Sequence, residues 1–175
     1  MIFLIVSGGE ATDEFVENVI KRGGYDVILA ADSGMDFLYR TKILPDIIVG
    51  DFDSVDPEVL EFFREHEEID ICALNPVKDD TDTEFAIRES IRRGATEITI
   101  IGGTGTRLDH VLGNISLLGI GLEEDVRMEL LDANNRIRMT DHSVVLKKKQ
   151  QYGKYLSLLP YSEKVTGVTL RGVKY

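Results

Sequence analysis

The sequence predicts an α/β protein in which residues 1–132 form a mostly parallel sheet with helices, and residues 133–175 form a smaller antiparallel β unit. Two observations favour this class. Short apolar runs rich in β-branched residues alternate with helical patterns up to about residue 132, which is typical of a parallel sheet with crossover helices. The later segments are short and partly alternating, as in antiparallel strands.

The first part contains six expected strands and five expected helices. The strands are predicted at 2–6, 26–31, 46–49, 69–73, 97–101 and 126–131, and their continuous apolar character predicts burial on both faces. The helices are predicted at 12–22, 34–40, 57–66, 81–93 and 108–119. Thr81-Asp82-Thr83-Glu84 fits a capping box, and Gly94 and Gly23-Gly24 fit helix ends. This order of elements predicts a Rossmann-like sheet.

The second part has a different pattern. Strands are expected at 134–140, 142–149, 154–159 and 164–170, separated by turn residues that include Gly153, Pro160 and Gly167. Four short strands make a thin sheet, so we expect this β unit to be truncated in the chain or completed by a partner chain.

Charge is distributed unevenly along the chain. Residues 1–125 hold 27 acidic and 10 basic side chains, whereas residues 126–175 hold 4 and 10. This asymmetry indicates two subdomains with different roles and disfavours nucleic-acid binding by the acidic part. No apolar run approaches the roughly 20 residues of a membrane helix, and the single cysteine, Cys72, favours a reducing cytoplasm.

Acidic residues follow four of the expected strands. The segments are Asp32-Ser33-Gly34, Gly50-Asp51-Phe52-Asp53-Ser54, Lys78-Asp79-Asp80-Thr81-Asp82 and Gly102-Gly103-Thr104-Gly105-Thr106-Arg107-Leu108-Asp109-His110. Ligands of open α/β sheets bind beyond the carboxyl ends of the strands. Carboxylates gathered at one edge repel each other unless a cation lies between them or their pKa values rise.

The acidic segment after the third strand predicts a Mg²⁺ site for phosphate-transfer chemistry. In Asp51-x-Asp53 an extended backbone would place both side chains on one side. Carboxylate oxygens select Mg²⁺ or Ca²⁺ over Zn²⁺, and the sequence has no Cys/His cluster for zinc. Mg²⁺ is typically held by one or two carboxylates together with phosphate oxygens.

The glycine-rich segment after the fifth strand is a candidate phosphate loop. Gly102, Gly103 and Gly105 would expose backbone N–H groups near a helix start, and Arg107 could bind a phosphate oxygen. The Walker pattern is absent, which excludes a P-loop NTPase. His110 could act as a general base or cap and pack at the helix start, and Asn114 could bind a ligand or cap the site. Ser7-Gly8-Gly9 is a weaker loop of the same kind.

Together these segments resemble the thiamine pyrophosphokinase family. The matching residues are Asp32-Ser33-Gly34, Gly50-Asp51-Phe52-Asp53-Ser54, Lys78-Asp79-Asp80-Thr81-Asp82 and Gly105-Thr106-Arg107-Leu108-Asp109-His110 with Asn114. Their order agrees with the family over roughly residues 1–135, and the stretch from Leu158 to Tyr175 resembles the start of the family's thiamine-binding β domain. Family members continue beyond this point, so we expect a partial β domain at 133–175.

The resemblance implies diphosphoryl transfer from ATP to the hydroxyl of thiamine, forming thiamine diphosphate and AMP, with Mg²⁺ in a cytoplasmic homodimer. By position, Asp51, Asp53 and Asp82 match the family's metal carboxylates. Asp32, Lys78, Thr81, Arg107 and Asp109 match residues around the phosphates and thiamine. Asp109, or less favourably Asp32, could accept the hydroxyl proton.

Three other functions fit the same residues. A diphosphokinase of related fold would act on a hydroxymethylpterin with the same metal apparatus. A non-catalytic module would bind Mg·ATP without transfer, and a structural site would bind Ca²⁺.

Overall fold

The computed structural model of the chain describes residues 1–53, 55–74 and 81–173. Its centre is one seven-stranded sheet with strand order β4-β3-β2-β1-β5-β6-β7. The strands are β1 (Ile2–Val6), β2 (Val27–Ala31), β3 (Ile47–Gly50), β4 (Asp70–Ala73), β5 (Glu97–Ile101), β6 (Arg127–Leu131) and β7 (Arg136–Ile137). All neighbours pair in parallel except β6 and β7, which are antiparallel. The prediction of a mostly parallel α/β sheet is therefore confirmed.

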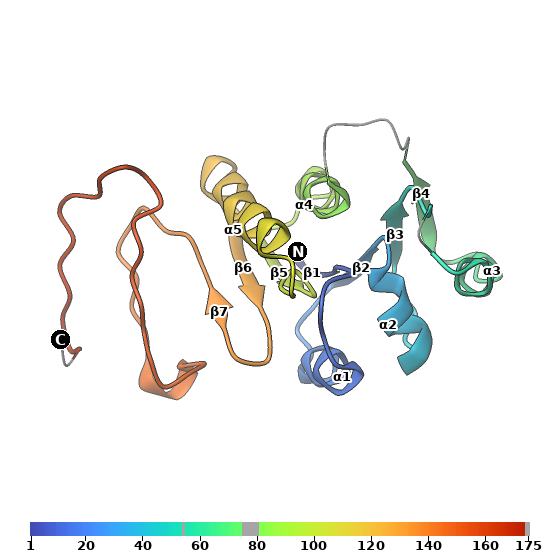
Figure 1. Cartoon of the computed structure of the whole chain (residues 1–175), viewed down its shortest axis with the longest axis horizontal. Coiled ribbons are helices and arrows are strands. Elements are labelled where there is room, and N and C mark those ends of the chain that lie inside the picture. Colours follow the sequence, from blue (N-terminus) through green and yellow to red (C-terminus); the bar gives the residue numbers. More distant parts are fainter. Residues whose placement is uncertain (54, 75–80, 174–175) are drawn as a thin grey trace.

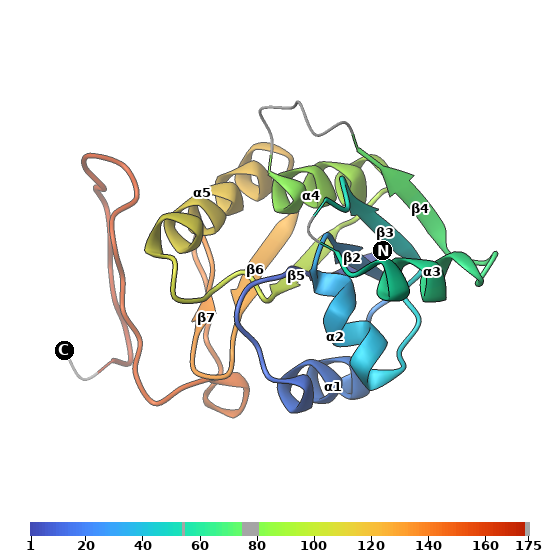
Figure 2. The same ribbon diagram turned by 45° about the vertical axis from the view of Figure 1, so that its right-hand side comes forward.

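Helices cover both faces of the sheet (Figures 1 and 2). They are α1 (Asp13–Arg22), α2 (Gly34–Thr41), α3 (Pro57–Arg64), α4 (Asp82–Arg92) and α5 (Leu108–Glu123). Val16, Met35 and Phe63 of α1, α2 and α3 pack on one face, and Ile87 and Leu118 of α4 and α5 pack on the other. None of the helices in the described part of the chain is long and apolar enough to cross a membrane.

The two cores explain why the central strands are apolar throughout. In β1, Leu4 and Val6 belong to the core under α1, α2 and α3, while Phe3 and Ile5 belong to the core under α4 and α5. Alternate residues of a strand point to opposite faces, so a strand covered on both faces must be apolar at every position. The edge strand β4 differs, because Asp70 and Ala73 at its ends are exposed, and the prediction of two buried faces is wrong there.

The helix ends follow the local signals in the sequence. The hydroxyl of Thr81 accepts a hydrogen bond from the Glu84 N–H at 3.2 Å, which caps α4. Gly23 and Gly94, which follow α1 and α4, have φ of 70° and 88°. These left-handed conformations cost glycine little and stop the helices where predicted.

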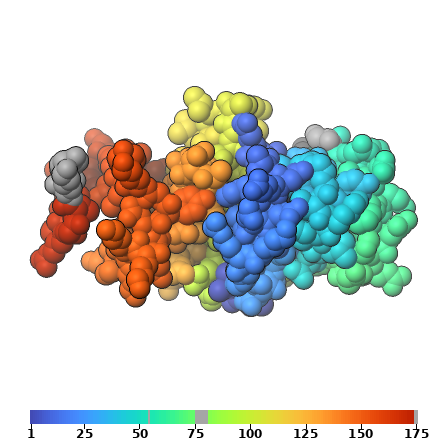
Figure 3. Space-filling view, turned by 90° about the horizontal axis from the view of Figure 1, so that it is seen from below, coloured from blue at the N-terminus to red at the C-terminus, as the bar shows by residue number. Residues whose placement is uncertain are grey.

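The strands predicted after residue 140 are not present in this structure. Only β7, within the predicted strand 134–140, pairs with a neighbour, and the described residues beyond it hold one short 3₁₀ helix at Lys148–Gln150. This segment extends away from the rest of the molecule (Figure 3, orange and red) and exposes large apolar side chains, such as Val145 and Leu159 at 82% and 87%. A strand needs a neighbour that satisfies its backbone and covers its apolar face, and these residues have no such neighbour here.

Ion pairs connect α4 to the edge strand β4. The buried carboxylate of Glu89 accepts hydrogen bonds from Arg92 at 2.6 and 2.7 Å and from Arg93 at 2.7 Å. Arg93 also donates to Asp70 of β4. The hydrogen bonds from Arg92, opposed by burial and reinforced by Arg93, lower the pKa of Glu89 from 4.5 to about 2.

Replacing Glu89 by Gln should lower the free energy of unfolding by about 2 kcal/mol at neutral pH, because a carboxylate with a lowered pKa stabilises the folded state above its unfolded pKa. That contribution is lost as pH falls from about 4.5 towards 2, so the difference between wild type and variant should shrink by more than half at about pH 3. Urea unfolding at both pH values measures it. Glu97→Gln, at an exposed pair with Arg127, is the control and should cost less than about 0.5 kcal/mol. An equal difference at both pH values would contradict the prediction.

Candidate functional site

The candidate site lies at the carboxyl end of β1, where the order of the strands along the sheet reverses. This strand pairs with β2 on one side and β5 on the other, and Val6 is level with Ala30 and Ile101. Loops leaving neighbouring strands in opposite directions open a crevice at such a switch point, where ligands of open α/β sheets bind. The segments after β1, β2, β3 and β5 all meet this edge.

The loops after β1 and β5 are packed against each other. The N–H groups of Gly9 and Glu10 donate to the carbonyls of Gly102 and Thr104 at 2.7 and 2.8 Å. Gly102 has φ of 67°, and a Cβ there would lie 2.0 Å from the Ser7 carbonyl oxygen. Only glycine fits this left-handed position with so close a backbone contact. The predicted loop glycines therefore join two strands, and Gly102 and Gly103 are buried.

The helix α5, which follows the β5 loop, holds this loop by a hydrogen bond. The amide of Asn114 in α5 donates to the Gly103 carbonyl at 2.8 Å. This hydrogen bond fits the predicted capping role of Asn114, and ligand binding by Asn114 stays a prediction. Gly105 is partly buried beside Glu10.

Asp32 follows β2 at the centre of the acidic edge. Its backbone is left-handed, with φ of 47°, and its N–H donates to the Val49 carbonyl at 2.8 Å. Its Oδ1 is buried and has no hydrogen-bond partner among the described residues. Burial raises the pKa of this carboxyl, the Ser33 N–H opposes the rise, and the charges of Asp82 and Asp51 add to it.

Ser33 and Gly34 turn the chain from β2 into α2. Ser33 is the N-cap residue, and its side chain makes no capping hydrogen bond. A Cβ on Gly34 would lie 1.9 Å from the Val6 carbonyl oxygen. The start of α2 thus lies directly against the end of β1, which brings Asp32 close to the switch point.

The segment after β3 forms a turn, and the prediction of an extended Asp51-x-Asp53 is wrong. Phe52 has φ of 62°, and the Asp53 N–H donates to Asp51 Oδ1 at 3.1 Å. The turn arises because the carboxylate of Asp51 captures a backbone N–H two residues on, as Asp commonly does in turns. Asp51 is partly buried, whereas Asp53 is exposed.

Asp82 reaches the edge from α4, of which it is the first residue after the N-cap Thr81. Its charge acts on Asp32. Lys78, Asp79 and Asp80 lie outside the described residues.

Arg107, Asp109 and His110 form an exposed group at the start of α5. Arg107 Nη2 lies 2.5 Å from Asp109 Oδ2, and both side chains are about two thirds exposed, at 67% and 63%. The hydrogen bond from Arg107 lowers the pKa of Asp109. His110 is exposed. Arg107 is the N-cap residue of α5 and makes no side-chain cap. Among the described residues its guanidinium is held by the exposed ion pair with Asp109, which a ligand could replace.

Among the described residues, the carboxylates do not form a preassembled metal centre. Within residues 1–53, 55–74 and 81–173, no group of three or more His, Cys, Asp or Glu side chains could hold a metal ion. Asp51 and Asp82 nevertheless lie near enough to Asp32 to raise its pKa. The assignment of Asp51, Asp53 and Asp82 as metal ligands stays a prediction.

Two features of this edge are not among the predicted site residues. Ser7, which is 3% exposed, and Thr83 in the first turn of α4 place their hydroxyl oxygens 2.9 Å apart. Asp36, in the first turn of α2, has a buried Oδ1 with no partner among the described residues. Neither feature had a signal in the sequence. Asp32 precedes the N-cap Ser33 of α2 and has a left-handed backbone, so its spacing to Asp36 is not a helical one. Ser7 and Thr83 lie 76 residues apart.

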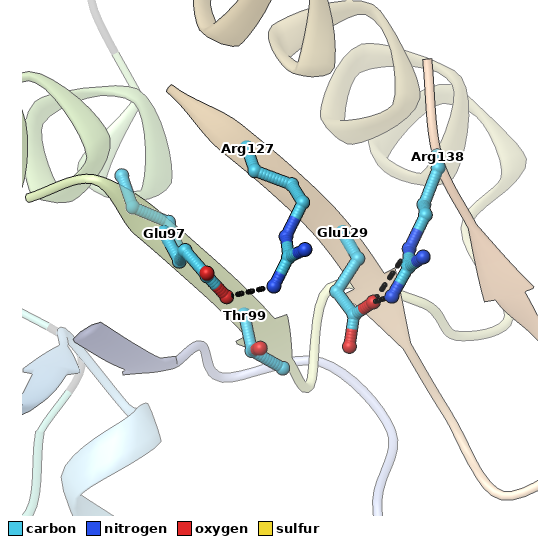
Figure 4. Close-up of a pocket in the computed structure, with 6 residues that line it drawn as sticks. Glu97, Thr99, Arg127, Glu129 and Arg138 are labelled. Carbon is cyan, nitrogen blue, oxygen red and sulfur yellow. Dashed lines mark hydrogen bonds and ion pairs between the residues drawn. The ribbon is translucent and has the colours of Figure 1, made fainter. Parts of the chain in front are cut away.

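A second pocket lies elsewhere on the sheet, and its acidic side chains form ion pairs with arginines of the same pocket (Figure 4). It is lined by Glu97, Ile98, Thr99, Arg127, Glu129 and Arg138. Glu97 pairs with Arg127, and Glu129 accepts from Arg138 Nε at 2.7 Å. Glu97 and Arg127 are the first residues of β5 and β6, so this pocket lies at the opposite end of the strands from the acidic edge.

The fold and the site define an open α/β protein with an acidic edge and glycine-rich loops at its switch point, the arrangement of proteins that bind phosphorylated ligands. The family model "Thiamin pyrophosphokinase, catalytic domain" matches residues 22–130. The model "Thiamin pyrophosphokinase, vitamin B1 binding domain" matches residues 141–175. The chain belongs to the thiamine pyrophosphokinase family.

Individual relatives agree with this assignment. The chain is 34% identical over 150 residues to a thiamine pyrophosphokinase of Bacillus subtilis, covering 84% of this chain and 68% of the relative. The crystal structure of the Bacillus subtilis thiamine pyrophosphokinase matches with a TM-score of 0.68 and 27% identity, covering 79% of this chain and 64% of that one. A family protein of Enterococcus faecalis matches with a TM-score of 0.65 and 33% identity, covering 78% and 63%. The chain thus spans about two thirds of the length of these relatives.

Proposed function

We propose that this protein transfers a diphosphoryl group from ATP to the hydroxyl of thiamine, forming thiamine diphosphate and AMP. Family membership supports the reaction. The observation that carries the proposal for the site is the partly buried Asp32, beside the charges of Asp51 and Asp82 at the switch point. One of its carboxylate oxygens is buried and has no partner among the described residues. Repulsion of this kind is relieved by a cation.

We propose that the cation is Mg²⁺, held by Asp51, Asp53 and Asp82 together with phosphate oxygens of ATP. The donor set fits, because all three side chains offer hard carboxylate oxygens. When bound, Mg²⁺ would neutralise negative charge on the phosphates. The turn at Phe52 and the start of α4 would carry these carboxylates to the ligand.

Other side chains would position the reactants. The hydroxyl oxygen of thiamine would attack the β-phosphorus while the bond to the α-phosphate oxygen breaks and AMP leaves. Arg107, released from Asp109, and Lys78, which lies outside the described residues, would bind the transferred group. The glycine loop held by Asn114 and the residues Ser33, Gly34 and Thr81 would shape the ATP pocket.

Asp32 is a second candidate, beside Asp109, for the acceptor of the hydroxyl proton. Burial raises the pKa of Asp32, whereas the hydrogen bond from Arg107 lowers the pKa of Asp109. A base is more effective when its pKa lies nearer the working pH. If Asp32 is the acceptor, Asp109 would serve to hold Arg107 until ATP binds.

The region 133–175 would contribute thiamine contacts, in a homodimer. The match of residues 141–175 to the vitamin B1 binding domain and the exposed apolar side chains of this segment support that role. The lone Cys72 supports a reducing cytoplasm as the location.

The direct test is AMP release from ATP with Mg²⁺ varied, using thiamine and a hydroxymethylpterin as alternative acceptors. Thiamine-dependent AMP release that requires Mg²⁺ is expected. AMP release with the pterin but not with thiamine would show that the acceptor is a hydroxymethylpterin. Tight ATP binding with no AMP formed would show that the protein is a binding module and not an enzyme. Running the same assay on a longer chain, if one exists, shows whether further residues complete the thiamine pocket.

A further inference from the structure

The hydroxyl pair formed by Ser7 and Thr83 joins two elements of the acidic edge. Ser7 follows β1, and its N–H donates to the Ile101 carbonyl at 2.8 Å. Its Oγ lies 2.9 Å from Oγ1 of Thr83, which is 76 residues further along the chain. With 3% of its surface exposed, Ser7 directs its hydroxyl to α4.

The position of Ser7 is rigidly defined. It follows the central strand β1, which is paired on both sides. Gly102 packs against the Ser7 carbonyl so closely that a Cβ would lie 2.0 Å from the oxygen. Because this backbone is so constrained, the Ser7 hydroxyl can hold a hydrogen-bond partner at a fixed place.

Thr83 is the neighbour of Asp82 in the first turn of α4. The buried residues of this helix, Ala86, Ile87, Glu89 and Ser90, lie beyond that turn. Asp82 lies close enough to Asp32 for their charges to repel, as does Asp51. This repulsion acts to move the first turn of α4 away from the edge, and the hydrogen bond to Ser7 opposes it.

We propose that Ser7 and Thr83 are positioning residues that hold Asp82 at the acidic edge, in place to bind the same divalent cation as Asp51. This inference rests on the proposed Mg²⁺ site. Neither hydroxyl touches the cation or the substrate. Their hydrogen bond sets the metal affinity by fixing the first turn of α4 before ligands arrive, so less ordering is needed on binding.

The test measures Mn²⁺ binding by electron paramagnetic resonance in the presence of α,β-methylene-ATP, a nucleotide that cannot release AMP. Ser7→Ala and Thr83→Val should each weaken Mn²⁺ binding about three- to tenfold, the worth of one hydrogen bond. The double variant should be no weaker than either single variant, because both remove the same contact. Thr83→Ser keeps the hydroxyl and should bind as wild type does.

Ser90→Ala is the matched control. It removes a hydroxyl hydrogen bond, Ser90 Oγ to the Ala86 carbonyl at 2.7 Å, from the same helix away from the edge. It should lower the melting temperature with Mn²⁺ affinity unchanged. Mn²⁺ affinity equal to wild type in folded Ser7→Ala, or additive losses in the double variant, would overturn the inference. No Mn²⁺ binding by the wild type with nucleotide would instead overturn the proposed metal site itself.

Discussion

Replacing Asp51 by Asn is expected to lower turnover on the order of a hundredfold while leaving the fold intact. The amide keeps the oxygen that accepts the Asp53 N–H and loses the charge that would hold Mg²⁺. Removing one of several repelling charges beside Asp32 should leave the melting temperature equal or higher, as is usual when a functional residue is neutralised. Thiamine-dependent AMP release, Mn²⁺ binding and thermal unfolding measure the three effects.

Asp56→Asn is the matched control for this experiment. Asp56 is exposed and caps α3 by accepting the Glu58 N–H at 2.9 Å. Asn caps a helix as well as Asp does, so this variant removes one acidic charge near the edge without touching the proposed ligands. It should keep wild-type turnover. If Asp51→Asn turns over as fast as the wild type at saturating Mg²⁺, Asp51 is not a ligand of the metal.

Replacing Gly34 by Ala should destabilise the protein by about 3 kcal/mol or more. The added Cβ would lie 1.9 Å from the Val6 carbonyl oxygen and 2.6 Å from its carbon. Both are backbone atoms of a central strand that cannot move aside, so the start of α2 must shift. Denaturant unfolding measures the loss, and a displaced α2 should also weaken nucleotide binding through Asp32.

Gly113→Ala tests whether the cost comes from the contact. A Cβ at Gly113, inside α5, meets nothing within 4 Å. Alanine is also the better helix former by about 1 kcal/mol, so this variant should be as stable as the wild type or more so. If Gly34→Ala unfolds at the same denaturant concentration as wild type, the close packing of α2 on β1 is not a constraint on this fold.

The elements of the first part could be predicted because their signals are local. The apolar run of β1 and the capping residue Thr81 act over a few residues, so periodicity and capping chemistry reveal them directly. The carboxyl ends of parallel strands share one edge by geometry, so the acidic edge also followed from the sequence. The strands predicted after residue 140 are absent from the described residues, because a strand forms only beside a neighbour, which a local pattern cannot supply.

The tertiary structure alone decided which edge residues meet. The strand order places β1 between β2 and β5, which brings Ser7 to Thr83 and the Gly9 loop to Gly102. The Asn114 bond to Gly103 is likewise an outcome of packing and hydrogen bonding in three dimensions. The sequence by itself determined that carboxylates and glycines gather at one edge of an α/β sheet. Only the fold decided how they are held there, because such contacts join residues far apart in the chain, and no local pattern encodes them.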